Sequence, residues 1–163
     1  MRMIATVLSM VFVCSAALAE TPRITRVDVT DFGEYTLDVQ AAGGTTGQGI
    51  AQRTVGNIKL LQQTRVIPLH KGVHFGFHFT LVGSPDGATV KLRSVTHYPP
   101  PGLQKPGASP IMSDESKRKL TIGESTYHGF TIVEDWMMMP GEWAIELWCG
   151  RQLLTTQTFT LVQ

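Results

Sequence analysis

The chain has 163 residues, of which 42% are hydrophobic and 17% are charged, and its formal net charge is +1. This length is enough for one domain with a substantial core and too short for two comfortable domains. Arg2 is the one charged residue of residues 1–19, so the remainder balances 13 basic against 13 acidic residues. Such a balance predicts no basic field for nucleic acid or anionic lipid, and no nucleic-acid partner is expected.

Residues 1–19 have the layout of a secretory signal peptide. Arg2 precedes an apolar run over residues 4–13, and Ala17 and Ala19 supply the small residues of a cleavage site. A membrane anchor would need about 20 apolar residues, more than this run contains. We therefore expect cleavage after Ala19, a periplasmic or secreted mature protein of residues 20–163, and no membrane span after cleavage. Only Cys149 then remains, which excludes an internal disulfide.

Alternating polar and apolar residues predict strands from the start of the mature chain. Residues 24–31 and 35–39 are typical of one bent or bulged strand, or of two short strands. Residues 41–49 are rich in glycine and threonine and predict a flexible hairpin loop or linker, since their spacing matches no nucleotide-binding motif. Residues 57–67 predict a strand that ends at a sheet edge before Pro68.

The clearest central strand covers residues 73–81. Phe75, Phe77 and Phe79 fall on every second position, so all three side chains point to one face, which we expect to be core. Residues 83–87 combine glycine, serine, proline and aspartate in a turn, and residues 88–96 resume the alternation through Val90 and Leu92.

Prolines dominate residues 97–110, which therefore cannot lie inside a sheet. We expect a surface segment, polyproline-like, that crosses between two sheets. Residues 113–119 are charged and predict a short loop or helical turn, whereas residues 120–122 and 127–133 predict further strands.

The last part of the chain predicts a hairpin. Trp143, Ile145, Leu147 and Cys149 share one face of a strand, and residues 153–161 supply its partner. The position of Cys149 indicates a buried, inert thiol. With seven to nine short strands and no amphipathic helix, the sequence predicts an all-β fold: a single antiparallel β-sandwich with immunoglobulin-like or Greek-key connections.

Two stretches, residues 63–83 with the segment at Tyr98 and residues 136–154 with Phe159, resemble a bacterial family of small single-domain proteins that is classed as a domain of unknown function. The resemblance implies an all-β fold and brings no catalytic residues. The shared features are Thr64, Ile67, Pro68, Gly72, Phe75, Gly76, Phe77, Pro99, Trp136, Pro140, Gly141, Trp143 and Phe159.

The sequence contains none of the usual catalytic constellations, so we expect a protein that is not an enzyme and needs no cofactor. Glu134 and Asp135 are adjacent, and on a strand they would point to opposite faces rather than form a working carboxylate pair. Cys149 has no histidine nearby in sequence to activate it. A cluster of His128, Glu134 and a serine hydroxyl in one cleft would revive the enzyme hypothesis.

Histidines and methionines leave open a metal site, with copper as the candidate ion. His74 and His78 share a strand face but lie about 13 Å apart along the strand, so another strand would have to supply His97 or His128. Thioether ligands that suit Cu(I) would come from Met137, Met138 and Met139.

The preferred hypothesis is a non-catalytic binding module of the bacterial envelope, with an envelope protein or a small ligand as partner. Its candidate partner-binding residues are aromatic and thioether side chains near the last hairpin, namely Trp136, Met137, Met138, Met139 and Trp148. The alternative is that the proline-rich segment covers both tryptophans.

Overall fold

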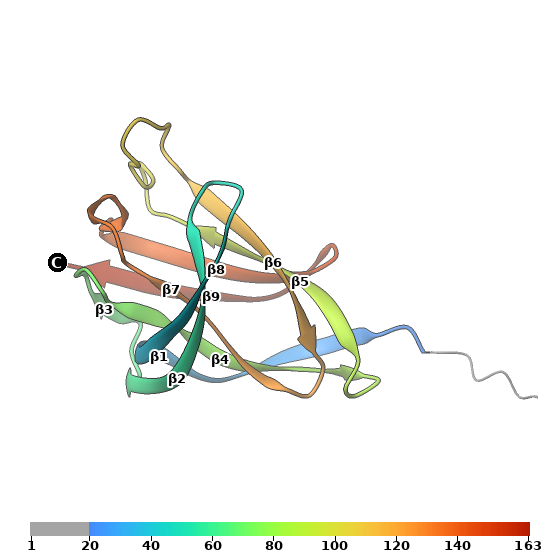
Figure 1. Ribbon diagram of the computed structural model, residues 1–163. Helices are drawn as coiled ribbons and strands as arrows, with labels where there is room; N and C mark the ends of the chain where they lie inside the picture. Colours follow the sequence, from blue (N-terminus) through green and yellow to red (C-terminus); the bar gives the residue numbers. More distant parts are fainter. Residues whose placement is uncertain (1–19) are drawn as a thin grey trace, which may run out of the picture.

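The computed structural model describes residues 20–163, and the expected signal peptide lies outside this range. Two β-sheets pack face to face, and one short 3-10 helix, η1 (Asp135–Met137), precedes the last hairpin (Figure 1). No helix within residues 20–163 is long and apolar enough to cross a membrane. The prediction of an all-β sandwich with seven to nine strands is confirmed.

The first sheet has four antiparallel strands in the order β2-β1-β4-β7. Its strands are β1 (Arg23–Thr45), β2 (Ala51–Gln62), β4 (His74–Ser84) and β7 (Ser125–Thr131). β1 is the single bulged strand that the sequence allowed: its pairing with β4 shifts register between Val29 and Asp31. β7 is an edge strand, bonded only to β4.

The second sheet has five strands in the order β3-β9-β8-β5-β6. They are β3 (Val66–Pro68), β5 (Thr89–His97), β6 (Ser113–Thr121), β8 (Gly141–Cys149) and β9 (Gln152–Val162). All of these strands pair antiparallel except β3, which runs parallel to β9. β6 is an edge strand like β7. Only residues 122–124 join the two strands, and both line one cavity, so the two sheets end on the same side of the sandwich.

Aromatic side chains fill the centre of the sandwich. Phe75, Phe77 and Phe79 on β4 are fully buried, as their spacing predicts. Trp143 packs edge-to-face on Phe75, with 5.6 Å between ring centroids, and Phe159 packs on the same ring at 5.4 Å. Edge-to-face contacts of this kind add stability beyond the burial of apolar area. Tyr98, at the start of the proline-rich segment, closes the cluster at 4.8 Å from Trp143.

One loop prediction and one strand prediction need correction. Residues 41–45 belong to β1, and only residues 46–50 form the turn to β2, because backbone pairing with residues 51–54 continues past the glycines. The strand predicted over residues 57–67 is two strands: β2 starts earlier, at Ala51, and Ile67 with Pro68 belongs to β3 in the other sheet.

The proline-rich segment does not cross between sheets. It joins β5 to β6, which are neighbours in one sheet, so residues 98–112 form a long hairpin connection closed by a bridge between Leu103 and Ile111. The charged residues 113–119, predicted as a loop or helical turn, form most of β6. The sequence did not indicate this strand because its residues are polar or charged up to Leu120, so no apolar residue recurs at every second position.

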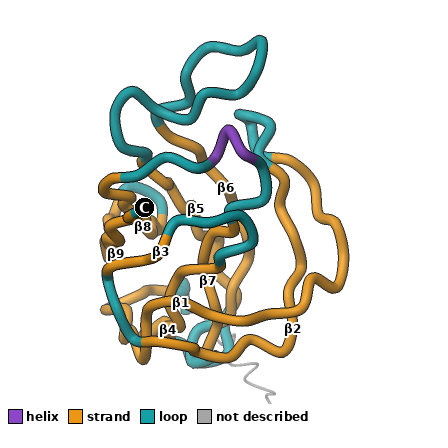
Figure 2. The backbone as a smooth tube through the Cα atoms, turned by 90° about the vertical axis from the view of Figure 1, so that its left-hand side faces the viewer, coloured by secondary structure: helices purple, strands orange, loops and turns teal. Residues whose placement is uncertain are grey.

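The distal half of the β1–β2 hairpin, residues 37–55, reaches beyond the first sheet, and we call it the arm. Its tip is closed by hydrogen bonds between Thr46 and Ile50. Figure 1 shows the teal tip standing beside β6, and Figure 2 shows β1 and β2 arching along one flank of the molecule. Ile50 is buried in the core cluster, and Lys105 of the proline-rich connection donates to the Gly49 carbonyl at 3.5 Å.

Candidate functional site

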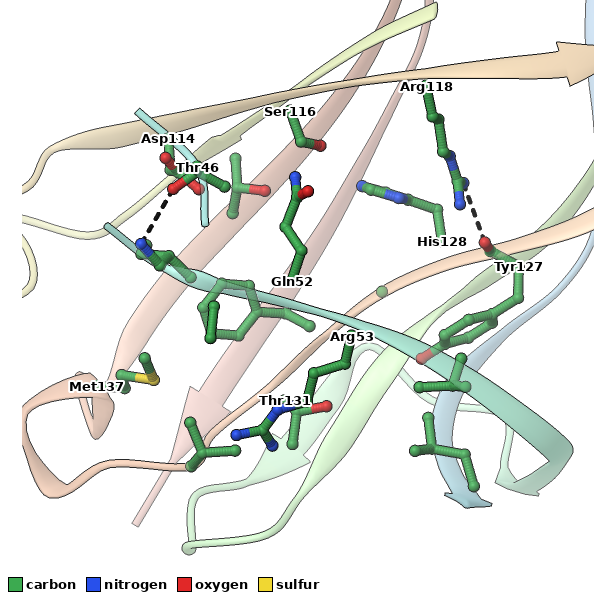
Figure 3. Close-up of a pocket in the computed structure, with 18 of the residues that line it drawn as sticks. Thr46, Gln52, Arg53, Asp114, Ser116, Arg118, Tyr127, His128, Thr131 and Met137 are labelled. Carbon is green, nitrogen blue, oxygen red and sulfur yellow. Dashed lines mark hydrogen bonds between the residues drawn. The ribbon is translucent and has the colours of Figure 1, made fainter. Parts of the chain in front are cut away.

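A cavity of about 260 Å³ lies where the two sheets end side by side, and we call it the β6–β7 slot. The arm covers it, while the edge strands β6 and β7 form its other walls (Figure 3). Apolar side chains line part of the slot, and polar groups converge from four strands, β2, β5, β6 and β7. The lining includes Ile50, Gln52, Arg53, Thr96, Asp114, Ser116, Arg118, Tyr127, His128, Phe130, Thr131 and Met137.

Asp114 is the most unusual polar residue of the slot. It is only 8% exposed, and its Oδ1 atom has no hydrogen-bond partner within residues 20–163. Burial raises the pKa of this carboxyl, although interactions with the Thr46 hydroxyl and the backbone of Glu115 and Gln48 oppose the shift. A buried polar atom without a partner costs free energy. Such an atom in a cavity wall is therefore suited to bind a hydrogen-bond donor.

Arg118 lies four residues further along β6, about 13 Å from Asp114 on an extended strand. One of its guanidinium nitrogens, Nη2, donates to the Tyr127 carbonyl on the free edge of β7 at 3.0 Å. No carboxylate within residues 20–163 forms a salt bridge with it, and burial lowers its pKa. Figure 3 shows Asp114 and Arg118 at opposite ends, with Gln52 and Ser116 between them. A guanidinium with spare donors is a site for a carboxylate or phosphate.

A serine–histidine pair borders the slot. His128 Nε2 lies 2.6 Å from the Ser94 hydroxyl, a distance that a nucleophile and its base would need. Burial, together with the nearby Arg118 charge, lowers the pKa of His128 to about 3. An imidazole of this pKa is a poor general base near neutral pH. Glu134, the third member of the cluster that would revive an enzyme hypothesis, is exposed beside η1 and does not line the slot.

The β7 wall contains a close backbone approach. Gly76 of β4 and Gly129 of β7 lie opposite each other, and the Tyr127 hydroxyl lies above them where side chains would otherwise stand. A Cβ atom at Gly76 would meet the His128 carbonyl and the Gly129 backbone. Tyr127 then packs against Tyr35 at 5.0 Å between ring centroids, which fixes the outer side of the slot.

Comparison with known proteins places this chain in a family. A family model described as a domain of unknown function, DUF3859, matches residues 28–161. The chain belongs to this family. The match covers every strand except the start of β1 and the last residue of β9, so the arm, β6 and β7 are all parts of the family domain. The predicted resemblance to a family without known function is confirmed.

An immunoglobulin-like protein from Pseudomonas aeruginosa has a similar structure, with a TM-score of 0.60 and 21% identity. The alignment covers 90% of this chain and 100% of that chain, which supports the immunoglobulin-like fold alone. An alkylpurine DNA glycosylase from Pseudomonas fluorescens gives a TM-score of 0.38 at 14% identity over 61% of this chain and 28% of its own, too low to support an argument. No curated protein matches the chain.

The four histidines proposed as metal ligands make four separate interactions. His74 bonds to Thr131, His78 to Asp31 and His128 to Ser94, whereas His97 lies 3.4 Å from Glu146. Within residues 20–163, no three His, Cys, Asp or Glu side chains are placed to hold a metal ion. Inward and outward positions alternate along a strand, which separates His128 from His74 and His78 on the outer face.

The five aromatic and thioether residues proposed for partner binding lie in two places. Trp136, Met137, Met138 and Met139 precede β8, whereas Trp148 lies near the other end of that strand, more than 20 Å away on an extended chain. Met137 is buried and lines the slot, and Met138 is 39% exposed. The proline-rich connection reaches Trp136 through Lys105, whose Nζ lies 5.8 Å from the ring centroid.

The sequence analysis missed Asp114 and Arg118 because residues 113–119 were predicted to form a loop or helical turn. The alternation was present in polar form: Asp114, Ser116, Arg118 and Leu120 occupy every second position. An inward face made of polar residues gives no hydrophobic signal, so only the pairing of β6 with β5 revealed it.

Proposed function

We propose that the protein is an exported, non-catalytic binding domain that holds a small polar ligand in the β6–β7 slot. The observation that carries the proposal is that two polar groups with unused hydrogen-bonding capacity lie at opposite ends of one cavity. They are the Asp114 carboxyl and the Arg118 guanidinium. An unsatisfied buried atom such as Asp114 Oδ1 lowers stability, so its presence in a cavity wall favours a role in binding.

The chemistry of the slot favours a linear ligand with two polar ends. Arg118 would bind an acidic group, and Asp114, about 13 Å away along β6, would accept a hydrogen bond from an amine or hydroxyl. Ile50, Phe130 and Met137 provide apolar contact for the part between the two ends. Omega-amino acids and short peptides fit this description.

Binding is favoured over catalysis by the state of the one nucleophile–base pair at the site. His128 does not take up a proton near neutral pH because its pKa is about 3. Ser94 is buried, and it is not among the residues that line the slot. Activation of this hydroxyl by His128 therefore has no support from the electrostatics of the site.

The proposal is tested by thermal unfolding of residues 20–163 with a panel of omega-amino acids and di- to tetrapeptides. A ligand at a hundredfold excess over its Kd adds about 2.7 kcal/mol, a rise of roughly 5 to 10 °C for a domain of this size. Arg118→Gln and Asp114→Asn should abolish the rise, whereas Lys119→Gln, on the same strand but facing outward, should keep it.

Native mass spectrometry of untagged protein extends this test to ligands outside the panel. A bound species should accompany the wild-type protein and be absent from the Arg118→Gln variant. No bound species together with no thermal shift would contradict the proposal. Export is tested separately by cell fractionation, in which deletion of residues 1–19 should retain the protein in the cytoplasm.

A further inference from the structure

A second unusual surface lies on the outer face of the five-stranded sheet, on the opposite side of β6 from the slot. Lys91 of β5 pairs directly with Lys119 of β6, and Arg93 pairs with Lys117. Like charges directly opposite each other destabilise an antiparallel pair. Two consecutive pairs of this kind on one face indicate that the positive charge serves a purpose other than folding.

Two carboxylates, Glu115 and Glu146, lie on this face against the four basic side chains. Glu115 contacts both Arg93 and Lys117 at 3.1 Å. Within residues 20–163 no carboxylate forms a salt bridge with Lys91 or Lys119. A hollow at this face adjoins Gly150 in the β8–β9 turn. Its lining includes the four basic residues of the two pairs together with Leu92 and Arg118. The overall balance of basic and acidic residues hides this local excess because opposite charges lie elsewhere on the molecule.

Apolar groups border the basic residues on the same face. Trp148 of β8 pairs with Arg93, and Leu153 of β9, which is 44% exposed, pairs with Trp148. The guanidinium of Arg93 lies 5.0 Å from the Trp148 ring centroid, so one ring face is covered and less open to a stacked base. This arrangement fits a lipid surface better than single-stranded nucleic acid, which needs open aromatic faces.

We propose that this face binds the surface of a membrane containing anionic lipids, with lipid phosphates contacting the four basic side chains and Leu153 entering the interface. Its charge and its single exposed leucine match the combination that peripheral membrane contact uses, electrostatic attraction plus a small apolar insertion. Lys117 and Arg118 line both the slot and the hollow, whereas Lys91, Arg93 and Lys119 do not line the slot. The inference is therefore tested at Lys91 and Lys119, which take no part in the proposed ligand site.

The test measures sedimentation of residues 20–163 with vesicles of equal parts phosphatidylglycerol and phosphatidylcholine, against vesicles of phosphatidylcholine alone. Binding should occur only with the anionic vesicles and should weaken as salt rises. The Lys91→Gln/Lys119→Gln variant should lose affinity about 30-fold, since each basic residue near an anionic surface contributes about fivefold. Leu153→Asn should weaken binding without changing its salt dependence.

The matched control is Arg23→Gln/Lys59→Gln, which removes the same charge from β1 and β2 in the other sheet. It should bind the vesicles as the wild type does, and circular dichroism should show that both double variants are folded. Equal loss in the control, equal binding to neutral vesicles, or no binding to anionic vesicles would overturn the proposal. Tighter binding to duplex DNA than to vesicles would also overturn it, in favour of a nucleic-acid partner.

Discussion

Trp143 and His128 both point between the two sheets, but they lie in regions with opposite character. Around Trp143 the inward positions of β4, β8 and β9 are fully buried apolar side chains in edge-to-face contact. Around His128 the inward positions of β5 and β6 include Ser94, Asp114 and Arg118. The same two-residue period thus builds a core that stabilises the domain and a polar wall that lowers its stability.

This difference suggests how to separate structural from functional residues in a fold without known activity. Residues that satisfy every packing and hydrogen-bonding requirement explain stability. Residues that leave a requirement unmet, such as the Asp114 carboxyl or the Lys91–Lys119 pair, are the candidates for binding. Substitution of one residue of either kind should therefore change the free energy of unfolding in a different way.

The largest effect is expected from Trp143→Ala. The side chain is fully buried and contacts Phe75, Tyr98 and Phe130, and replacement of such an aromatic residue costs about 3 to 5 kcal/mol. Urea denaturation measures the loss, with Val66→Ala on an exposed position of β3 as the control. A loss below about 1 kcal/mol would show that the aromatic cluster is not the main source of stability.

The second effect is a dependence of stability on pH through His128. Its pKa is about 3 in the folded protein and about 6.5 in the unfolded chain, so between these values only the unfolded chain binds the proton. The free energy of unfolding contributed by this residue is fully present above pH 6.5 and falls by about 1.4 kcal/mol per pH unit below it. Denaturation at pH 7, 5 and 4 measures this slope.

His128→Asn should have a shallower slope over this pH range, because no imidazole remains to be protonated on unfolding. His97→Gln is the control, since His97 is exposed, and it should keep the wild-type slope. If the Asn variant and the wild type lose stability in parallel, His128 is protonated in the folded state, and the argument against its role as a general base would fail.

A smaller effect of opposite sign is expected from Asp114→Asn. Burial raises the pKa of Asp114, so this carboxyl contributes most to stability below its unfolded pKa of about 3.9 and loses that contribution as pH rises. Removal of the charge should therefore stabilise the protein at pH 7, by an amount on the order of 1 kcal/mol. The gain should disappear near pH 3. A loss of stability at pH 7 would indicate that the ionised carboxyl is structurally required.

The smallest effect is expected on the outer face of the second sheet. Lys119→Gln removes the repulsion with Lys91, and we expect a gain of about 0.2 to 0.5 kcal/mol that shrinks at high salt. Lys59→Gln on β2 provides the comparison. No gain at low salt would mean that the flexible lysine side chains avoid each other. The argument that charge repulsion on this face lowers the stability of the domain would then fail.

Much of the fold followed from single residues and their spacing. The three phenylalanines of β4 and the alternation through Trp143 and Ile145 predicted buried strands, and both predictions are confirmed. The site was less predictable. Its residues come from the arm, β5, β6, β7 and η1, and the most distant of them are about 100 positions apart in sequence. The β6 residues resembled a charged loop or helical turn.

The sequence alone determined the all-β sandwich and its aromatic core, because a side-chain period of two with large apolar residues has one stable solution, a sheet with a buried face. Tertiary structure alone decided that β6 is a strand, that the arm covers the free side of the sandwich, and that Asp114 and Arg118 share a cavity. Polar residues on an edge strand have no intrinsic preference for the inside. Their position follows from backbone pairing with β5, a long-range contact that local pattern does not encode.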